Sequence, residues 1–169
     1  IRLMLGSSVE GFQEKSGTIQ VLLKGEEPVS ADMAVLAIGV TPDTPLAREA
    51  GLELGIKGSI LVNDRMETSA PDIYAVGDAV QVKHFVTGEA ALISLAGPAN
   101  KQGRIAADNI CGGDSRFSGS LGSSVIKLFD MTAASTGINE RTAKAAGIDC
   151  GKVYLSPSSH AGYYPGARV

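Results

Sequence analysis

The chain has 169 residues, of which 44% are hydrophobic, and its formal net charge is −3. This length can bury the core of one ordinary domain, and the lack of a long basic run leaves no electrostatic footprint for nucleic-acid binding. No apolar run approaches the ~20 residues that a membrane helix needs. Because the chain begins with Ile1 rather than Met, we expect it to be part of a longer protein. Two cysteines without a CxxC pattern favour reduced, structural thiols in a cytoplasmic protein.

The first fifty residues predict a meander, a buried strand and a short helix. Strands are expected at Arg2–Leu5 and Thr18–Lys24, with a polar segment between them. The continuous apolar run of residues 33–38, ended by Gly39, is typical of a strand buried on both faces. Two prolines then take the chain out of the sheet, and Leu46–Ala50 can form a short helix.

The middle of the chain predicts two short strands and one long helix. Strands are expected at Ser59–Val62 and Ile73–Val76, and Ala79–Glu89 has no clear period and is expected to be a loop. A helix of mostly small residues is expected from about Gly97 to Ile110. Helical spacing predicts an inward face made of Ala99, Gly103, Ala106, Ala107 and Ile110.

The last third predicts strands and one capped helix. Asn139 is a suitable N-cap for a helix over Glu140–Ala146, and Gly147 is suited to end it. The expected strands are Val125–Phe129, Ala133–Ile138 and Lys152–Leu155.

The strand expected at Ile73–Val76 leads directly into Gly77 and Asp78. In open α/β sheets, ligands bind beyond the carboxyl ends of the strands. Glycine lets the backbone approach a ligand closely, and a carboxylate accepts hydrogen bonds from hydroxyl groups such as those of a sugar alcohol. A Gly-Asp pair by itself is more typical of an ordinary turn, so the dipeptide alone favours the turn.

The full string TSAPDIYAVGDA, which begins at Thr68, resembles the second FAD-binding signature of the pyridine nucleotide-disulphide oxidoreductases. The resemblance implies that Asp78, with Gly77 beside it, binds the ribityl chain of FAD.

A second string, AVLAIGVTPDT, resembles the strand and turn that close the NAD(P)H domain of the same family, with Asp43 in place of the usual Asn. The resemblance implies NAD(P)H contacts at Gly39 and Ser94.

A third string, LAGPANKQGRIAA, resembles the family's helix whose first residues face the flavin pyrimidine ring. Unpaired N–H groups at a helix start stabilise negative charge and so favour a reduced, anionic flavin. The resemblance assigns these backbone contacts to Leu95, Ala96 and Gly97, and by the same resemblance Asn100 and Lys101 contact a substrate such as coenzyme A. On its own, the segment favours an ordinary Ala-rich packing helix.

Residues 123–147 and the terminal string HAGYYPGA resemble the start of the family's dimerisation domain, in its coenzyme A-disulfide reductase and NADH oxidase branch. The resemblance implies a homodimer in which Tyr163 or Tyr164 of one subunit reaches the active site of the other. Packing at the interface explains both tyrosines equally well. His160 has no acidic neighbour and does not resemble the His-Glu pair of the glutathione reductase branch.

These observations predict an α/β fold, in which part of a split, Rossmann-like FAD-binding domain is followed by part of an α+β dimerisation domain. The expected parts are the end of an NAD(P)H-binding domain at residues 1–41, the second segment of the FAD domain at 42–114, and the start of the dimerisation domain at 115–169. No metal site is expected.

The expected function is transfer of hydride from NAD(P)H through FAD to a cysteine-based redox centre, and on to a disulfide such as coenzyme A disulfide. Alternatives are an NADH oxidase, a peroxidase or a polysulfide reductase of the same family, a ferredoxin or rubredoxin reductase relative, and a non-catalytic dimerisation or flavin-binding module. No GxGxxG motif and no candidate redox cysteine occur in the 169 residues. We therefore expect this polypeptide alone to lack disulfide reductase activity and to bind FAD weakly or not at all.

Overall fold

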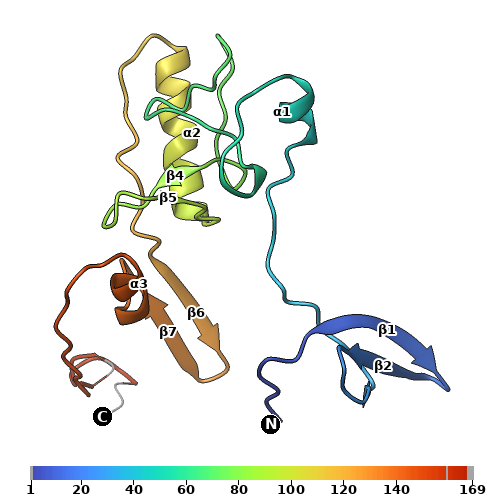
Figure 1. The fold of residues 1–169 in the computed structure, drawn as a ribbon. Helices are drawn as coiled ribbons and strands as arrows, with labels where there is room; N and C mark the ends of the chain where they lie inside the picture. The colour runs from blue at the N-terminus through green and yellow to red at the C-terminus, as the bar shows by residue number, and fades with distance from the viewer. Residues whose placement is uncertain (1, 159, 167–169) are drawn as a thin grey trace. The chain divides into compact units, whose positions relative to one another are not determined.

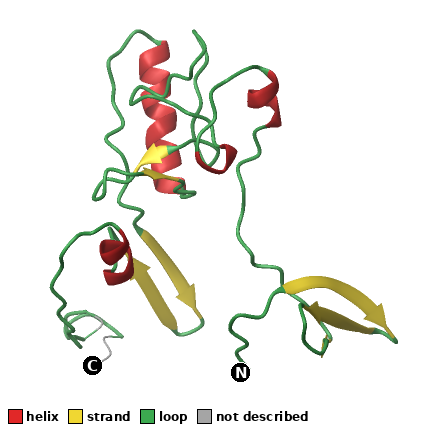
Figure 2. Ribbon diagram, in the orientation of Figure 1, coloured by secondary structure: helices red, strands yellow, loops and turns green. Residues whose placement is uncertain are grey.

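The computed structural model describes residues 2–158 and 160–166, and the chain divides into two compact units, Ile1–Val40 and Thr41–Val169. Between the helices and strands much of the chain is loop (Figure 2). No helix in the described part of the chain is long and apolar enough to span a membrane.

The first unit is a three-stranded antiparallel sheet in the order β1 (Val9–Lys15), β2 (Thr18–Leu23) and β3 (Val29–Ala31) (Figure 1). Ser16 and Gly17 join β1 to β2 at φ values of 53° and 78°, the geometry that a two-residue hairpin requires. This tight turn makes the segment directly before it the partner of β2.

Two strand predictions in this unit are wrong. Residues 2–5 contain no strand. The partner of β2 is instead the polar segment that was expected to be a connection, and this segment forms β1. The apolar run of residues 33–38 is also not a strand, and the side chains of Val35 and Ile38 are 82% and 83% exposed. No described strand pairs with this run, so the burial that its composition predicts is not met within the unit.

The second unit contains one long helix, α2 (Ala96–Ile110), and two short antiparallel ladders (Figure 1). Five apolar side chains form its buried core: Met66, Val80, Val82, Ala106 and Phe117. The other elements are α1 (Pro45–Glu49), η1 (Ile56–Gly58), β4 (Val82–Lys83), β5 (Ala90–Ala91), β6 (Ser124–Leu128), β7 (Met131–Ser135) and α3 (Glu140–Ala145).

Three predictions before α2 fail in detail. The segments Ser59–Val62 and Ile73–Val76 form single bridges rather than strands, since Ile60 pairs with Leu54 and Val80, and Tyr74 pairs with Glu67. The segment expected to be a loop contains β4. Residues at positive φ interrupt the extended chain around these bridges, with Met66 at 67° and Asp72 at 62°, so the ladders stay one pair long.

The helix α2 is confirmed within one residue of the expected start, but its buried face differs from the expected one. Gln102, Ala106 and Asn109 are buried, whereas Ala107 is exposed and Ile110 is 63% exposed. The spacing of the buried residues is helical. The prediction followed apolar residues only, and two of the three buried positions are amides that form hydrogen bonds with backbone groups.

Local signals near the end of the chain are largely confirmed. The Asn139 side chain accepts a hydrogen bond of 2.9 Å from the Thr142 backbone N–H at the start of α3, and Gly147 follows the helix at a φ of 68°. The hairpin β6–β7 exists, but β7 begins at Met131 because a two-residue turn pairs Met131 with Leu128. Residues 152–155 contain no strand.

Candidate functional site

The loop that carries Gly77 and Asp78 is open on one side. Gly77 has a φ of 89°, and no heavy atom lies within 4 Å of the position that a Cβ would take. The Asp78 side chain is exposed. Within the described residues, no side-chain hydrogen bond or ion pair engages its carboxylate, so its oxygens are free to accept hydrogen bonds from a ligand.

A buried side chain of α2 forms a hydrogen bond with this loop. The Gly77 backbone N–H donates a hydrogen bond of 2.7 Å to Oε1 of Gln102, and Gln102 is only 1% exposed. The backbone N–H of Val80 also donates to the Gly77 carbonyl at 3.4 Å. The end of the signature, at Gly77, therefore has a fixed position relative to α2.

A second buried amide of α2 anchors the chain just before the signature. Asn109, which is 5% exposed, donates hydrogen bonds of 3.0 Å to the Arg65 carbonyl and 2.9 Å to the Ser115 carbonyl. Its Oδ1 accepts a bond of 2.9 Å from the Ser115 N–H. Gln102 and Asn109 are two helical turns apart and so share one face of α2. Asn109 therefore holds the turn before the signature, whereas Gln102 holds Gly77 within it.

The turn before the signature carries a charged cluster, which we call the Arg65 cluster: Asn63, Asp64, Arg65, Glu67, Asp114 and Arg116. Arg65 pairs with Glu67 at 3.1 Å and also with Asp114. The Asn63 amide donates to Glu67 at 2.7 Å. These hydrogen bonds, first that from Asn63 and then that from Arg65, lower the pKa of Glu67 below its ordinary value of 4.5.

The lowered pKa of Glu67 predicts an acid-sensitive contribution to folding. Because the folded-state pKa lies below the unfolded one, this contribution is complete above the ordinary value of 4.5 and is lost as pH falls through the lowered value. We expect Glu67→Gln to reduce the acid-induced fall in the urea unfolding midpoint. The matched change Glu49→Gln, at an exposed carboxyl of α1, should leave that fall unchanged. Identical pH profiles for wild type and Glu67→Gln would contradict the assignment.

The first turn of α2 presents backbone donors that have no partner among the described residues. Leu95 is the N-cap residue and makes no side-chain capping hydrogen bond, so the first N–H groups, those of Ala96 and Gly97, have no cap. No heavy atom lies within 4 Å of a Cβ built on Gly97. A cavity of about 350 Å³ opens at this end of the helix, and its lining includes Gly97, Lys101 and the segment 117–121.

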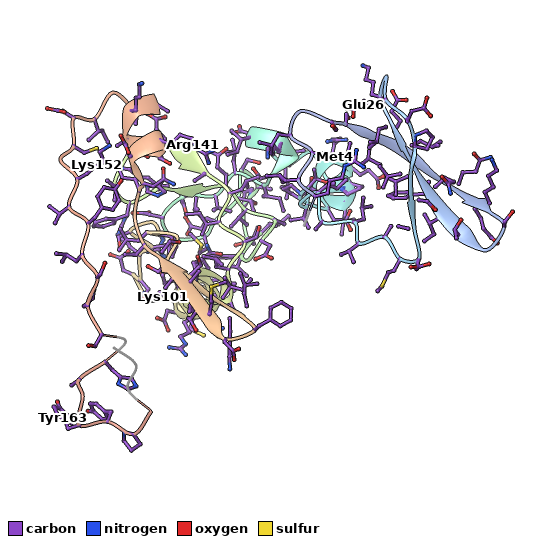
Figure 3. The ribbon with its side chains drawn as sticks, turned by 90° about the horizontal axis from the view of Figure 1, so that it is seen from below. Met4, Glu26, Lys101, Arg141, Lys152 and Tyr163 are labelled. Atoms are coloured by element: carbon purple, nitrogen blue, oxygen red, sulfur yellow. The ribbon has the colours of Figure 1, made fainter. Side chains whose placement is uncertain are left out.

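The remaining predicted site residues are not joined to this loop by any hydrogen bond within the described chain. Ser94 is exposed one residue before the N-cap of α2, and the Asn100 side chain donates to the Ala96 carbonyl at 3.1 Å. Gly39 belongs to the first unit. Tyr163 and Tyr164 are 82% and 56% exposed in the C-terminal turn (Figure 3), with ring centroids 4.9 Å apart.

Gln102 belongs to the site, and the two cysteines lie on the surface. Gln102 was not expected to be part of the site, although its spacing from Ala99 and Ala106 places it on the same helical stripe. Cys111 and Cys150 were expected to be reduced, structural thiols; both are free, and both are exposed, so neither belongs to the buried core.

The exposed Asp78 carboxylate follows a glycine turn that is hydrogen-bonded to a long helix, in a chain of mixed α/β structure. The family model of the pyridine nucleotide-disulphide oxidoreductases matches residues 1–103. The chain belongs to this family.

Similar proteins agree on the family but differ in their named activities. The NAD(P)H sulfur oxidoreductase (CoA-dependent) of Pyrococcus abyssi is 38% identical over 82% of this chain and 31% of its own length. The structure of reduced CoADR-RHD from Bacillus anthracis has 48% identity and a TM-score of 0.85, covering 95% of this chain and 29% of that one. A FAD-dependent family member from Desulfovibrio vulgaris has 40% identity and a TM-score of 0.75, covering 84% and 36%.

Other curated relatives are coenzyme A disulfide reductases and NADH oxidases. The chain spans 31% to 37% of the length of the first four curated relatives.

Proposed function

We propose that this chain supplies the part of an FAD site that faces the ribityl chain and the pyrimidine ring, in an NAD(P)H-dependent oxidoreductase. The observation that carries the proposal is the free Asp78 carboxylate beside the open Gly77 turn, in a loop tied to α2. The D. vulgaris relative, which is described as FAD-dependent, supports the choice of cofactor.

The residues of the loop and helix fit this cofactor chemically. Asp78 accepts a hydrogen bond from a ribityl hydroxyl group. The open space at Gly77 and Gly97 lets the backbone approach the cofactor without a Cβ in the way. The uncapped start of α2 places the N–H groups of Ala96 and Gly97, with Leu95 before them, where they stabilise negative charge. When bound, the flavin supplies the hydride-accepting chemistry.

The nicotinamide cofactor and the homodimer are further parts of the proposal. A similar structure, the water-forming NADH oxidase of Lactobacillus brevis, was solved with NADH bound, at 29% identity and a TM-score of 0.83. Gly39 and Ser94 are the residues proposed to contact NAD(P)H. In a homodimer, the exposed Tyr163 or Tyr164 would reach the other subunit's active site.

For the electron acceptor we propose a disulfide, with coenzyme A disulfide as the leading case. Support comes from the relatives named coenzyme A disulfide reductase and CoA-dependent sulfur oxidoreductase. Lys101 lines the cavity at the start of α2, so its ammonium group can meet an anionic substrate there, with Asn100 one residue before it. Oxygen is the second candidate acceptor, because some relatives are NADH oxidases. Polysulfide is the third, because another relative is a polysulfide/persulfide reductase.

An activity comparison tests the proposal. The complete gene product is assayed for oxidation of NADH and NADPH with coenzyme A disulfide, polysulfide or oxygen as the acceptor, beside the 169-residue polypeptide. We expect turnover by the complete gene product with one of these acceptors, and none by the 169 residues, which contain no GxGxxG motif. A complete gene product that binds flavin but oxidises neither nucleotide would instead indicate a non-catalytic module.

A further inference from the structure

Within the described residues, one side-chain hydrogen bond joins α2 to the loop of Gly77 and Asp78, which we call the Asp78 loop, and its acceptor is Gln102. Its Oε1 accepts the Gly77 N–H at 2.7 Å from a position that is 1% exposed. A buried, packed side chain has little freedom to move. The bond therefore fixes the backbone one residue before the carboxylate, while the Asp78 side chain stays exposed.

The same helix carries the N–H groups at its start. Gln102 lies six residues after Ala96, which is about 9 Å along the helix axis at 1.5 Å per residue. Because a helix of 15 residues is a rigid element, the hydrogen bond holds the Asp78 loop at a set position relative to the first turn of α2. Two groups that act on different parts of one ligand need such a fixed relation, since small misplacements weaken binding sharply.

We propose that Gln102 is a positioning residue, which sets the Asp78 loop against the start of α2 so that the carboxylate meets a ribityl hydroxyl group. This inference rests on the proposed function, and it adds a residue to which the family resemblance gives no role. Gln102 itself touches no ligand and acts through Gly77 and Asp78.

The test uses the complete gene product, stripped of flavin and titrated with FAD. Gln102→Met keeps the length of the side chain but removes the acceptor, and we expect the dissociation constant for FAD to rise about tenfold. Gln102→Glu keeps a side-chain oxygen as acceptor for the Gly77 N–H, so it should lose less affinity than Gln102→Met. Circular dichroism confirms that each variant is folded under the conditions of the titration.

The chain offers a matched control on the same face of the same helix. Asn109 is also a buried amide with backbone partners, but it holds Arg65 and Ser115 rather than Gly77. We expect Asn109→Leu to lower the unfolding midpoint while leaving FAD affinity close to that of wild type. An equal loss of affinity in Asn109→Leu and Gln102→Met would overturn the proposal, because the effect would then be general packing.

A double variant separates positioning from any independent role. If Gln102 acts through Asp78, Gln102→Met should add little to the loss already caused by Asp78→Ala. Full additivity of the two losses, or wild-type affinity in Gln102→Met, would overturn the inference while leaving the proposed function standing. A wild-type gene product that binds no FAD would overturn the proposed function itself, and this inference with it.

Discussion

Asp78→Ala is expected to weaken FAD binding by roughly 10- to 100-fold, with no loss of folding stability. A hydrogen bond to a charged group contributes about 1.5–3 kcal/mol, and each ~1.4 kcal/mol corresponds to a tenfold change in affinity. The Asp78 side chain is exposed, so its removal leaves the core and the bond between Gly77 and Gln102 in place. Titration of the flavin-free gene product with FAD measures the effect.

The same segment supplies a charge-matched control. Asp72 is also exposed and lies at a φ of 62°, a conformation that Asn tolerates well. We expect Asp72→Asn to leave FAD affinity unchanged, whereas Asp78→Asn, which keeps only a neutral acceptor, should fall between wild type and Asp78→Ala. Equal effects of Asp72→Asn and Asp78→Asn would show that only net charge matters and would remove Asp78 from the site.

Met66→Ala is expected to destabilise the second unit by about 2–5 kcal/mol. Met66 is 2% exposed and packs in the core with Val80, Val82 and Phe117. Removal of its side chain leaves a cavity next to the signature segment. Met66 is adjacent to that segment because the Ala75 N–H donates to the Met66 carbonyl at 3.1 Å. Alanine keeps the backbone restriction at the positive φ of 67°, so the change reports on packing. The urea unfolding midpoint measures it.

An exposed methionine provides the control for this change. Met131, at the start of β7, is 69% exposed, and Met131→Ala should alter the unfolding midpoint little. If Met66→Ala proved as mild as Met131→Ala, the core assigned to the second unit would be wrong.

Elements that local chemistry determines were predictable from the sequence. The Asn139 cap and Gly147 mark α3 because both act within a few residues of the helix. The helix α2 follows from its helix-compatible composition and Gly112 after it. The signature segment predicted Gly77 and Asp78 as site residues. In the structure no atom fills the space beside Gly77, and the Asp78 side chain is exposed. Their cofactor role stays a prediction.

Elements that depend on distant partners were not predictable in the same way. Residues 33–38 have the composition of a buried strand, but no described strand pairs with them. Single bridges at Ile60 and Tyr74 replace the expected strands because pairing depends on turns at positive φ that composition does not reveal. Gln102 and Asn109 were missed since a polar amide is ordinarily assigned to the surface, whereas hydrogen bonds to backbone groups allow both to be buried.

The flavin content of the purified complete gene product tests the central claim most directly. The visible absorption spectrum is recorded, and the cofactor is then released by denaturation and identified. The account predicts stoichiometric FAD in the wild type and a large loss of it in Asp78→Ala. A folded wild-type protein without flavin that also fails to take up added FAD would contradict the account.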